Sequence, residues 1–193
     1  LASIHTDRAE NLAKPERGNM SNDQTVTGVE RHFDENELIV SKTDLKGHIT
    51  YANDVFLDIA DYTEKEVLGQ PHSLIRHPDM PRSVFKLLWD TLHEGSEIFA
   101  YVINRAKNGD HYWVLAHVTP SKDANNQVIG YHSNRRVPDK RIIMENIIPL
   151  YKSLRDEENR HENRKDGMNA AYDMVGALLA DKGVGYDEFV ATL

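Results

Sequence analysis

Two ligand-binding side chains and a carboxylate stand together in the segment Arg76-His77-Pro78-Asp79. The planar guanidinium of Arg76 can hold a pyrophosphate or a carboxylate through paired hydrogen bonds. His77 can donate a hydrogen bond to a ligand or ligate a haem iron, or it can fill a hydrogen-bonded structural role. Asp79 can orient either neighbour, or it can cap a helix that begins near Pro81. The segment predicts a binding site, with structural roles open as alternatives.

Two asparagines extend this candidate set. Asn104 falls within a predicted strand, where asparagine is disfavoured, so its amide is expected to face a pocket and bond a ring carbonyl or nitrogen. Asn53 could also face a ligand, but its place before an apolar helical pattern is equally well explained by an N-terminal cap. The sequence alone does not choose between these two roles for Asn53.

The composition narrows the classes of function. The chain has 193 residues, and its formal net charge of −8 argues against a general binder of nucleic acids or anionic membranes. It contains no cysteine, which excludes disulfides and thiolate metal sites. No nucleophile–base pair, glycine-rich phosphate loop or close carboxylate pair is recognisable, so an enzyme is not expected. A membrane-spanning run and an apolar signal-peptide core are both lacking, so we expect a cytoplasmic protein.

The elements that must position these residues follow from turn and periodicity signals. Strands are predicted at 38–40, 48–51, 98–105, 112–118 and 128–136, with an Asn-Gly hairpin turn at 107–110. Short helices are predicted after Asn53 and Thr63, followed by an irregular proline-rich stretch at 70–81 and a helix at 82–94. This order predicts an α+β fold, in which an antiparallel sheet has its helices on one face.

The segment after Pro138 has a different, helical character. Its apolar residues have a coiled-coil-like spacing at Ile143, Ile147, Leu150 and Leu154. Pro149 is expected to kink this helix, and residues 155–166 are almost wholly polar. An apolar pattern at the same spacing resumes at Met168, Ala171, Val175 and Leu178. We therefore predict two helices that are joined by a labile polar junction.

These patterns divide the chain into three parts. Residues 1–36 are interpreted as an N-terminal leader or cap, 37–138 as the α+β domain, and 139–193 as a C-terminal helical segment. Within the first part, residues 1–19 could be added leader sequence ahead of a natural start at Met20. The alternative is a short N-terminal helix that packs on the domain.

Several motifs go beyond these general patterns. They are Thr43–Leu45, Tyr51–Phe56, Gly69–His72, Ile75–Pro81, Lys107–Trp113 and Pro149–Lys152. The blocks Ile75–Pro81 and Lys107–Trp113 are specific when they occur together. On these motifs, which are spread over somewhat more than half of the chain, the sequence resembles the PAS domains of bacterial aerotaxis receptors.

The resemblance implies a PAS fold with a five-stranded antiparallel sheet, noncovalent FAD, and a redox or oxygen-linked signal. The positions that match flavin-associated residues of the family are Asn53, Arg76, His77, Asp79, Phe85 and Asn104. Ile98 departs from the family, which has a tryptophan there, and this change removes a ring-stacking partner worth about 1 kcal/mol. Because the chain has no cysteine, a light-driven cysteinyl–flavin bond is excluded.

The resemblance also implies that residues 37–138 are a PAS sensor domain and that residues 139–193 serve signalling and dimerisation. A signalling partner is expected as well. The chain lacks the large signalling domain of a chemoreceptor, so we expect a stand-alone sensor that docks on a separate chemoreceptor or histidine kinase. A homodimer through the PAS domain and the C-terminal helices is expected, without a nucleic-acid partner or membrane insertion. Two alternatives remain open: a haem-based gas sensor, in which His77 or another pocket histidine ligates haem b, and a cofactor-free PAS module for dimerisation or docking.

Overall fold

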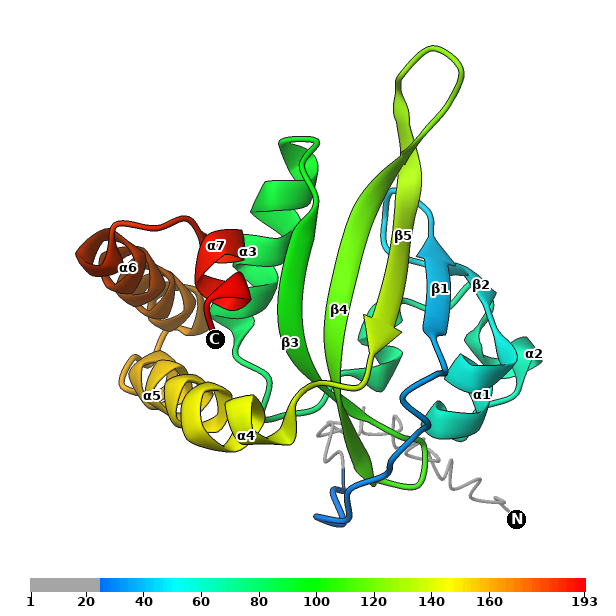
Figure 1. Cartoon of the computed structure of the whole chain (residues 1–193), viewed down its shortest axis with the longest axis horizontal. Helices are drawn as coiled ribbons and strands as arrows, with labels where there is room; N and C mark the ends of the chain where they lie inside the picture. The colour runs from blue at the N-terminus through cyan, green and yellow to red at the C-terminus, as the bar shows by residue number, and fades with distance from the viewer. Residues whose placement is uncertain (1–24) are drawn as a thin grey trace, which may run out of the picture.

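The computed structural model describes residues 25–193, and its centre is one antiparallel sheet (Figure 1). Five strands form the sheet: β1 (Ile39–Thr43), β2 (Ile49–Ala52), β3 (Ile98–Arg105), β4 (His111–Lys122) and β5 (Val128–Arg136). They lie in the order β2-β1-β5-β4-β3, and every neighbouring pair is antiparallel. All five predicted strands are confirmed, and β4 extends farther than its alternating pattern predicted.

The hairpin between β3 and β4 fixes the register of strands that carry candidate residues. Gly109 at its tip has a φ of +97°, a conformation that glycine adopts without steric cost. The side-chain oxygen of Asn108 accepts the backbone N–H of Asp110 at 3.0 Å. The resulting register places Asn104 opposite Tyr112. Directly opposed residues share a face of the sheet, so these two side chains point the same way.

Short helices cover one face of the sheet, which we call the inner face. They are α1 (Asp54–Ala60), α2 (Glu64–Val67), the 3-10 helix η1 (His72–Ile75) and α3 (Arg82–His93). The Trp89 ring of α3 packs edge-on against Tyr131 of β5, and the Phe56 ring of α1 lies 5.7 Å from the guanidinium of Arg135. The predicted α+β layout, with the helices of the domain on one face, is therefore confirmed.

Beyond β5 the chain forms a group of helices beside the edge strand β3 (Figure 1). They are α4 (Lys140–Ile142), the π-helical turn η2 (Ile143–Ile147), α5 (Ile148–Asn159), α6 (Arg164–Lys182) and α7 (Tyr186–Ala191). The kink expected at Pro149 takes the form of the π-helical turn, because a proline at the start of α5 offers no backbone N–H to the turn before it. The polar junction is shorter than predicted and separates α5 from α6 at residues 160–163.

The apolar seam of these helices is buried within the chain. Its buried members are Ile143, Ile147, Leu154, Ala171 and Val175. Helix α5 packs on α6, and α6 packs on α3. Tyr151 in the same seam donates its hydroxyl hydrogen to the carbonyl oxygen of Tyr101 in β3 at 2.5 Å. The spacing that suggested a coiled coil thus serves packing inside one chain, because the seam faces α3 and β3.

Residues 25–36 lie along the start of β4 and form part of the predicted N-terminal cap. The backbone N–H of Thr27 donates to the carbonyl of Gly109 at 3.0 Å. The N–H of Arg31 donates to the carbonyl of His111 at 2.7 Å, and the N–H of His111 donates to the carbonyl of Val29 at 2.9 Å. The expectations for residues 1–19 and Met20 lie outside the described residues.

Helix length and polarity also bear on membrane insertion. Among residues 25–193, no helix combines the length and the apolar character needed to span a bilayer.

Candidate functional site

A row of polar side chains crosses the inner face of the sheet. Its members are Ser41, Asn104, Tyr112, Ser133 and Arg135, all of them buried. Ser41 lies opposite Ser133, and Asn104 lies opposite Tyr112. Arg135 follows Ser133 by two residues on β5, so the two side chains share a face. Polar groups this deep in a core are costly unless they are hydrogen-bonded, so we take this row as the first candidate for a binding surface.

Arg135 is the charged centre of the row and is only 3% exposed. Its Nη2 donates to Oγ of Ser41 at 2.9 Å and to Nε2 of His72 at 2.6 Å. His72 can accept this bond only as a neutral imidazole, and burial beside the guanidinium lowers the pKa of His72 to about 3. Burial also lowers the pKa of Arg135 to about 10, which leaves the guanidinium charged at neutral pH. The site therefore holds a buried cation whose protein partners are neutral.

Several polar atoms on this face have no hydrogen-bond partner in the described part of the chain. They are Nη1 of Arg135, Nδ2 of Asn104, Oγ of Ser133 and the hydroxyl of Tyr112. Native interiors rarely leave such atoms unpaired, because each one costs about 1–3 kcal/mol. Guanidinium and amide N–H groups need acceptors, which the carbonyl oxygens and nitrogens of a flat heterocycle provide. The donor set on this face therefore fits a flavin ring.

Three of the residues predicted from the sequence lie together at one end of the row. The guanidinium of Arg76 lies 4.2 Å from the ring centroid of Phe85, a cation–π contact. The backbone of Arg76 forms an isolated antiparallel bridge with Asn104. Burial lowers the pKa of Arg76. Arg76, Phe85 and Asn104 thus form one group that joins the irregular segment, α3 and β3.

His77 and Asp79 lie next to this group, but they face different neighbours. Nδ1 of His77 accepts the backbone N–H of Asp79 at 3.0 Å, which assigns the proton of the neutral ring to Nε2. Burial lowers the pKa of His77 to about 4, so the ring is neutral near pH 7. The half-exposed carboxylate of Asp79 pairs with Arg155 of α5. The N-cap residue of α3 is Pro81, which makes no side-chain capping bond. Asp79 therefore does not cap α3.

Asn53 makes only structural contacts with the described residues. Its side-chain oxygen accepts the backbone N–H of Val40 at 2.9 Å and that of Phe56 at 3.1 Å. Its amide nitrogen donates to the carbonyl of Leu38 at 2.8 Å. These bonds cap α1 and tie it to β1, as the structural alternative predicted. A ligand contact for Asn53 stays a prediction.

The polar centre of the inner face was not found from the sequence. Ser41, His72, Ser133 and Arg135 were absent from the predicted site. One signal could have found two of them, because Tyr131, Ser133 and Arg135 alternate on β5 and one face of a strand carries every second residue. Reading that alternation inward would have placed an arginine in the core.

Ile98 is also on the inner face, opposite Val118, and it is 1% exposed. It lies six positions before Asn104 on the same strand, which corresponds to about 20 Å along β3. A larger ring at position 98 would therefore face the interior; the stacking contact that the resemblance implies stays a prediction.

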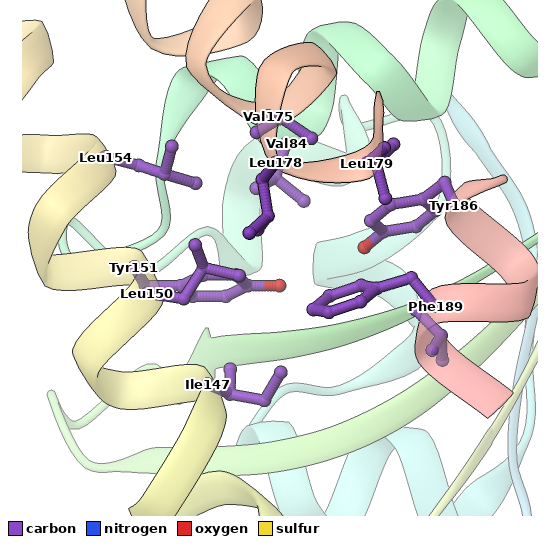
Figure 2. Close-up of a pocket in the computed structure, with 11 residues that line it drawn as sticks. Val84, Ile147, Leu150, Tyr151, Leu154, Val175, Leu178, Leu179, Tyr186 and Phe189 are labelled. Carbon is purple, nitrogen blue, oxygen red and sulfur yellow. The ribbon is translucent and has the colours of Figure 1, made fainter. Parts of the chain in front are cut away.

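An apolar cavity lies elsewhere, between α3 and the C-terminal helices (Figure 2). Side chains of α5, α6 and α7 line it, and Figure 2 shows the hydroxyl groups of Tyr151 and Tyr186 directed into it. Its volume is about 10 Å³, which is room for at most one water molecule. A cavity of this volume is too small for an organic cofactor.

Comparisons with known proteins agree with this fold. Residues 49–135 match the family model described as PAS fold. The matched residues form a PAS domain that runs from β2 into β5 and includes the helices of the inner face.

Particular relatives narrow the comparison further. The aerotaxis receptor of Escherichia coli is 42% identical over 136 residues, which are 70% of this chain and 26% of that protein. The nitrogen fixation regulatory protein of Klebsiella pneumoniae is 26% identical over 137 residues, which cover 64% of this chain and 28% of that protein. This chain thus spans about a quarter of the length of either relative.

A solved structure shows the same fold. It is the light state of the LOV domain of the blue-light photoreceptor Aureochrome1, with a TM-score of 0.50 and 17% identity. The match covers 61% of this chain and 91% of that domain. The predicted PAS fold is confirmed by these findings.

Proposed function

We propose that this chain is a redox or oxygen sensor that binds FAD noncovalently between the inner face of the sheet and the helices that cover it. The observation that carries the proposal is the buried, charged Arg135, whose Nη1 has no partner among the described residues. The unpaired amide of Asn104 lies on the same face. A flavin ring offers acceptors to both groups. Similarity to a protein named for aerotaxis supports the same class of signal.

In the proposed site, one group of residues binds the flavin ring and another binds the pyrophosphate. Asn104, Arg135 and neutral His72 would hold the polar edge of the ring. Arg76, stacked on Phe85, would bind the pyrophosphate through its guanidinium fork. We also propose that Asn53, His77 and Asp79 contribute to the FAD site, next to these two groups.

Bound FAD would supply reversible uptake of electrons, with changes of charge and protonation on its ring. Arg135 would bind more strongly as negative charge accumulates, because charge-assisted hydrogen bonds are about twice as strong as neutral ones. The Nδ2 of Asn104 has no protein partner among the described residues, so no hydrogen bond from that atom to the protein would oppose a reorientation of its amide. A substitution at Asn104 that leaves both flavin content and redox signalling unchanged would count against this role.

The haem alternative is less well supported by the geometry of His77. Haem ligation through Nε2 requires that atom to be free of its proton, whereas the bond from Asp79 to Nδ1 assigns the proton to Nε2. A cofactor-free docking module is also less well supported, because it would leave the polar atoms of the inner face unpaired.

The proposed output is a contact with a separate chemoreceptor or histidine kinase. A homodimer in the cytoplasm remains part of the proposal. Because the apolar seam of α5 and α6 is buried within the chain, such a dimer would use other surfaces in this arrangement.

An absorbance spectrum of the freshly purified protein tests the proposal, followed by denaturation and identification of any released chromophore. We expect a flavin spectrum and release of FAD. A Soret band would replace the proposal with the haem sensor. A protein that stays colourless after incubation with FAD would leave the docking module.

A further inference from the structure

The C-terminal helices are fastened to the start of α3 by one buried carboxylate. Glu158, in the last turn of α5, is 4% exposed. Its Oε1 accepts the backbone N–H of Ser83 at 2.8 Å, and its Oε2 accepts the Nε–H of Arg82 at 3.0 Å. These bonds join parts of the chain that lie 75 and 76 positions apart in the sequence.

This carboxylate replaces a cap that α3 does not have. The first N–H groups of a helix need acceptors from outside the helix, and they favour negative charge. The residue before α3 is Pro81, which makes no side-chain capping bond. Glu158 supplies both the acceptor and the charge from another helix, so the position of α3 depends on the position of α5.

A second bond ties the same helix to the candidate site. Arg155, one turn before Glu158, pairs with Asp79. The backbone N–H of Asp79 donates to His77, and the neighbouring Arg76 is bridged to Asn104. Contacts therefore run without interruption from the inner face of the sheet to α5.

The crossing of α5 and α6 holds Glu158 in place. Gly167 of α6 lies so close to the backbone carbonyl of Glu158 that a Cβ atom at position 167 would overlap it. The fixed crossing means that a movement of Glu158 also moves α6.

We propose that Glu158 is a positioning residue that couples the state of the candidate site to the C-terminal helices. The inference rests on the proposed function and names its route of regulation. Coupling is reciprocal, so a change in the redox state of the bound flavin alters the stability of the α5–α3 contact. Loss of that contact in turn alters the midpoint potential of the flavin. Glu158→Gln keeps the shape of the side chain but removes its charge. Glu157→Gln is the matched control, because its side chain contacts Arg160 and His161 within its own segment.

Hydrogen exchange of the full chain, measured with oxidised and with reduced FAD, tests the coupling. In the wild type and in Glu157→Gln we expect exchange of α5 and of the first turn of α3 to differ between the two redox states by about threefold or more. In Glu158→Gln this difference should disappear, and the midpoint potential of the flavin should shift. Equal exchange in both redox states of the wild type, or an unchanged potential and redox response in Glu158→Gln, would overturn the coupling.

A second measurement separates this inference from the proposed function. If the protein binds no flavin, the proposed function fails and the redox coupling fails with it. Hydrogen exchange measured on the cofactor-free variants then decides whether the Glu158 contact itself exists. About tenfold faster exchange at α3 and α5 in Glu158→Gln than in Glu157→Gln would show the contact. If flavin binds but these rates are equal, the coupling alone is wrong.

Discussion

Arg135 carries a positive charge on the inner face of the sheet, where its partners Ser41 and His72 are neutral. A buried charge without an opposite partner is a large cost to the folded state. Binding sites retain such groups because a ligand can complete their interactions. Arg135 should therefore lower the stability of the FAD-free protein and raise its affinity for FAD.

Substitution of Arg135 by methionine should separate these two effects. We expect the FAD-free variant to be as stable as the wild type or up to about 2 kcal/mol more stable, because an uncompensated charge has been replaced by an apolar chain. Its affinity for FAD should fall at least about tenfold, as expected for loss of a charged hydrogen bond. Urea unfolding and FAD titration measure the two quantities. Arg136→Met is the control, because the neighbouring side chain is exposed. Lower stability of FAD-free Arg135→Met, together with unchanged FAD affinity, would show a purely structural arginine.

His77 should make stability depend on pH. Burial lowers the pKa of His77 to about 4 from an ordinary value near 6.5, so the unfolded chain binds the proton more readily than the folded chain. The stabilisation by neutral His77 is complete above about pH 6.5 and is lost as the pH falls from there toward 4. His77→Gln should reduce the slope of unfolding free energy against pH in this window by up to about 1.4 kcal/mol per pH unit. Urea unfolding at several pH values measures the slope, and the exposed His32 provides the control substitution. An identical slope in His77→Gln would contradict the assigned neutral, buried ring.

At the scale of elements, the contact between α5 and α6 depends on Gly167. Alanine normally favours a helix over glycine by about 1 kcal/mol. At position 167 the sign should reverse, because the added Cβ would overlap the carbonyl of Glu158. We expect Gly167→Ala to lower the free energy of unfolding by about 1–3 kcal/mol.

Gly176 lies on the same helix and provides the control for Gly167. An added Cβ there meets no atom of residues 25–193 within 4 Å. Gly176→Ala should therefore raise stability by up to about 1 kcal/mol. Chemical denaturation of both variants gives the comparison, and equal stabilisation by both substitutions would show that the two helices do not pack this closely.

The seam of α5 offers a second test at this scale. Leu154 is fully buried, whereas Met144 in the preceding turn is 58% exposed. Leu154→Ala should cost about 2–5 kcal/mol of stability without changing the molar mass in solution, because the seam packs inside one chain. Met144→Ala should change stability by less than about 0.5 kcal/mol. Light scattering at matched concentrations measures the molar mass. Conversion of a dimer into a stable monomer by Leu154→Ala would contradict packing of the seam inside one chain.

At the scale of the whole molecule, local signals predicted the elements better than the site. Asn53, Thr63 and the Asn-Gly turn act on neighbouring residues, so their effects could be read directly from the sequence. The site depends on register: only the alignment of three strands places Asn104 opposite Tyr112, and Arg135 opposite Ala116, on one face. Glu158 meets Ser83 across 75 positions, and no local pattern marks such a pair. The seam was recognised as apolar, but the surface that covers it could not be predicted from spacing alone.

We propose above that the polar inner face of the PAS domain holds a flavin. The most direct test is the flavin content per chain of the full protein after saturation with FAD and removal of the excess. A double variant, Asn104→Leu with Arg135→Met, is compared with the exposed-site control Arg136→Met. We expect close to one flavin per chain in the wild type and the control, and almost none in a folded double variant. Absence of flavin from the wild type, or equal content in the double variant, would contradict the proposal.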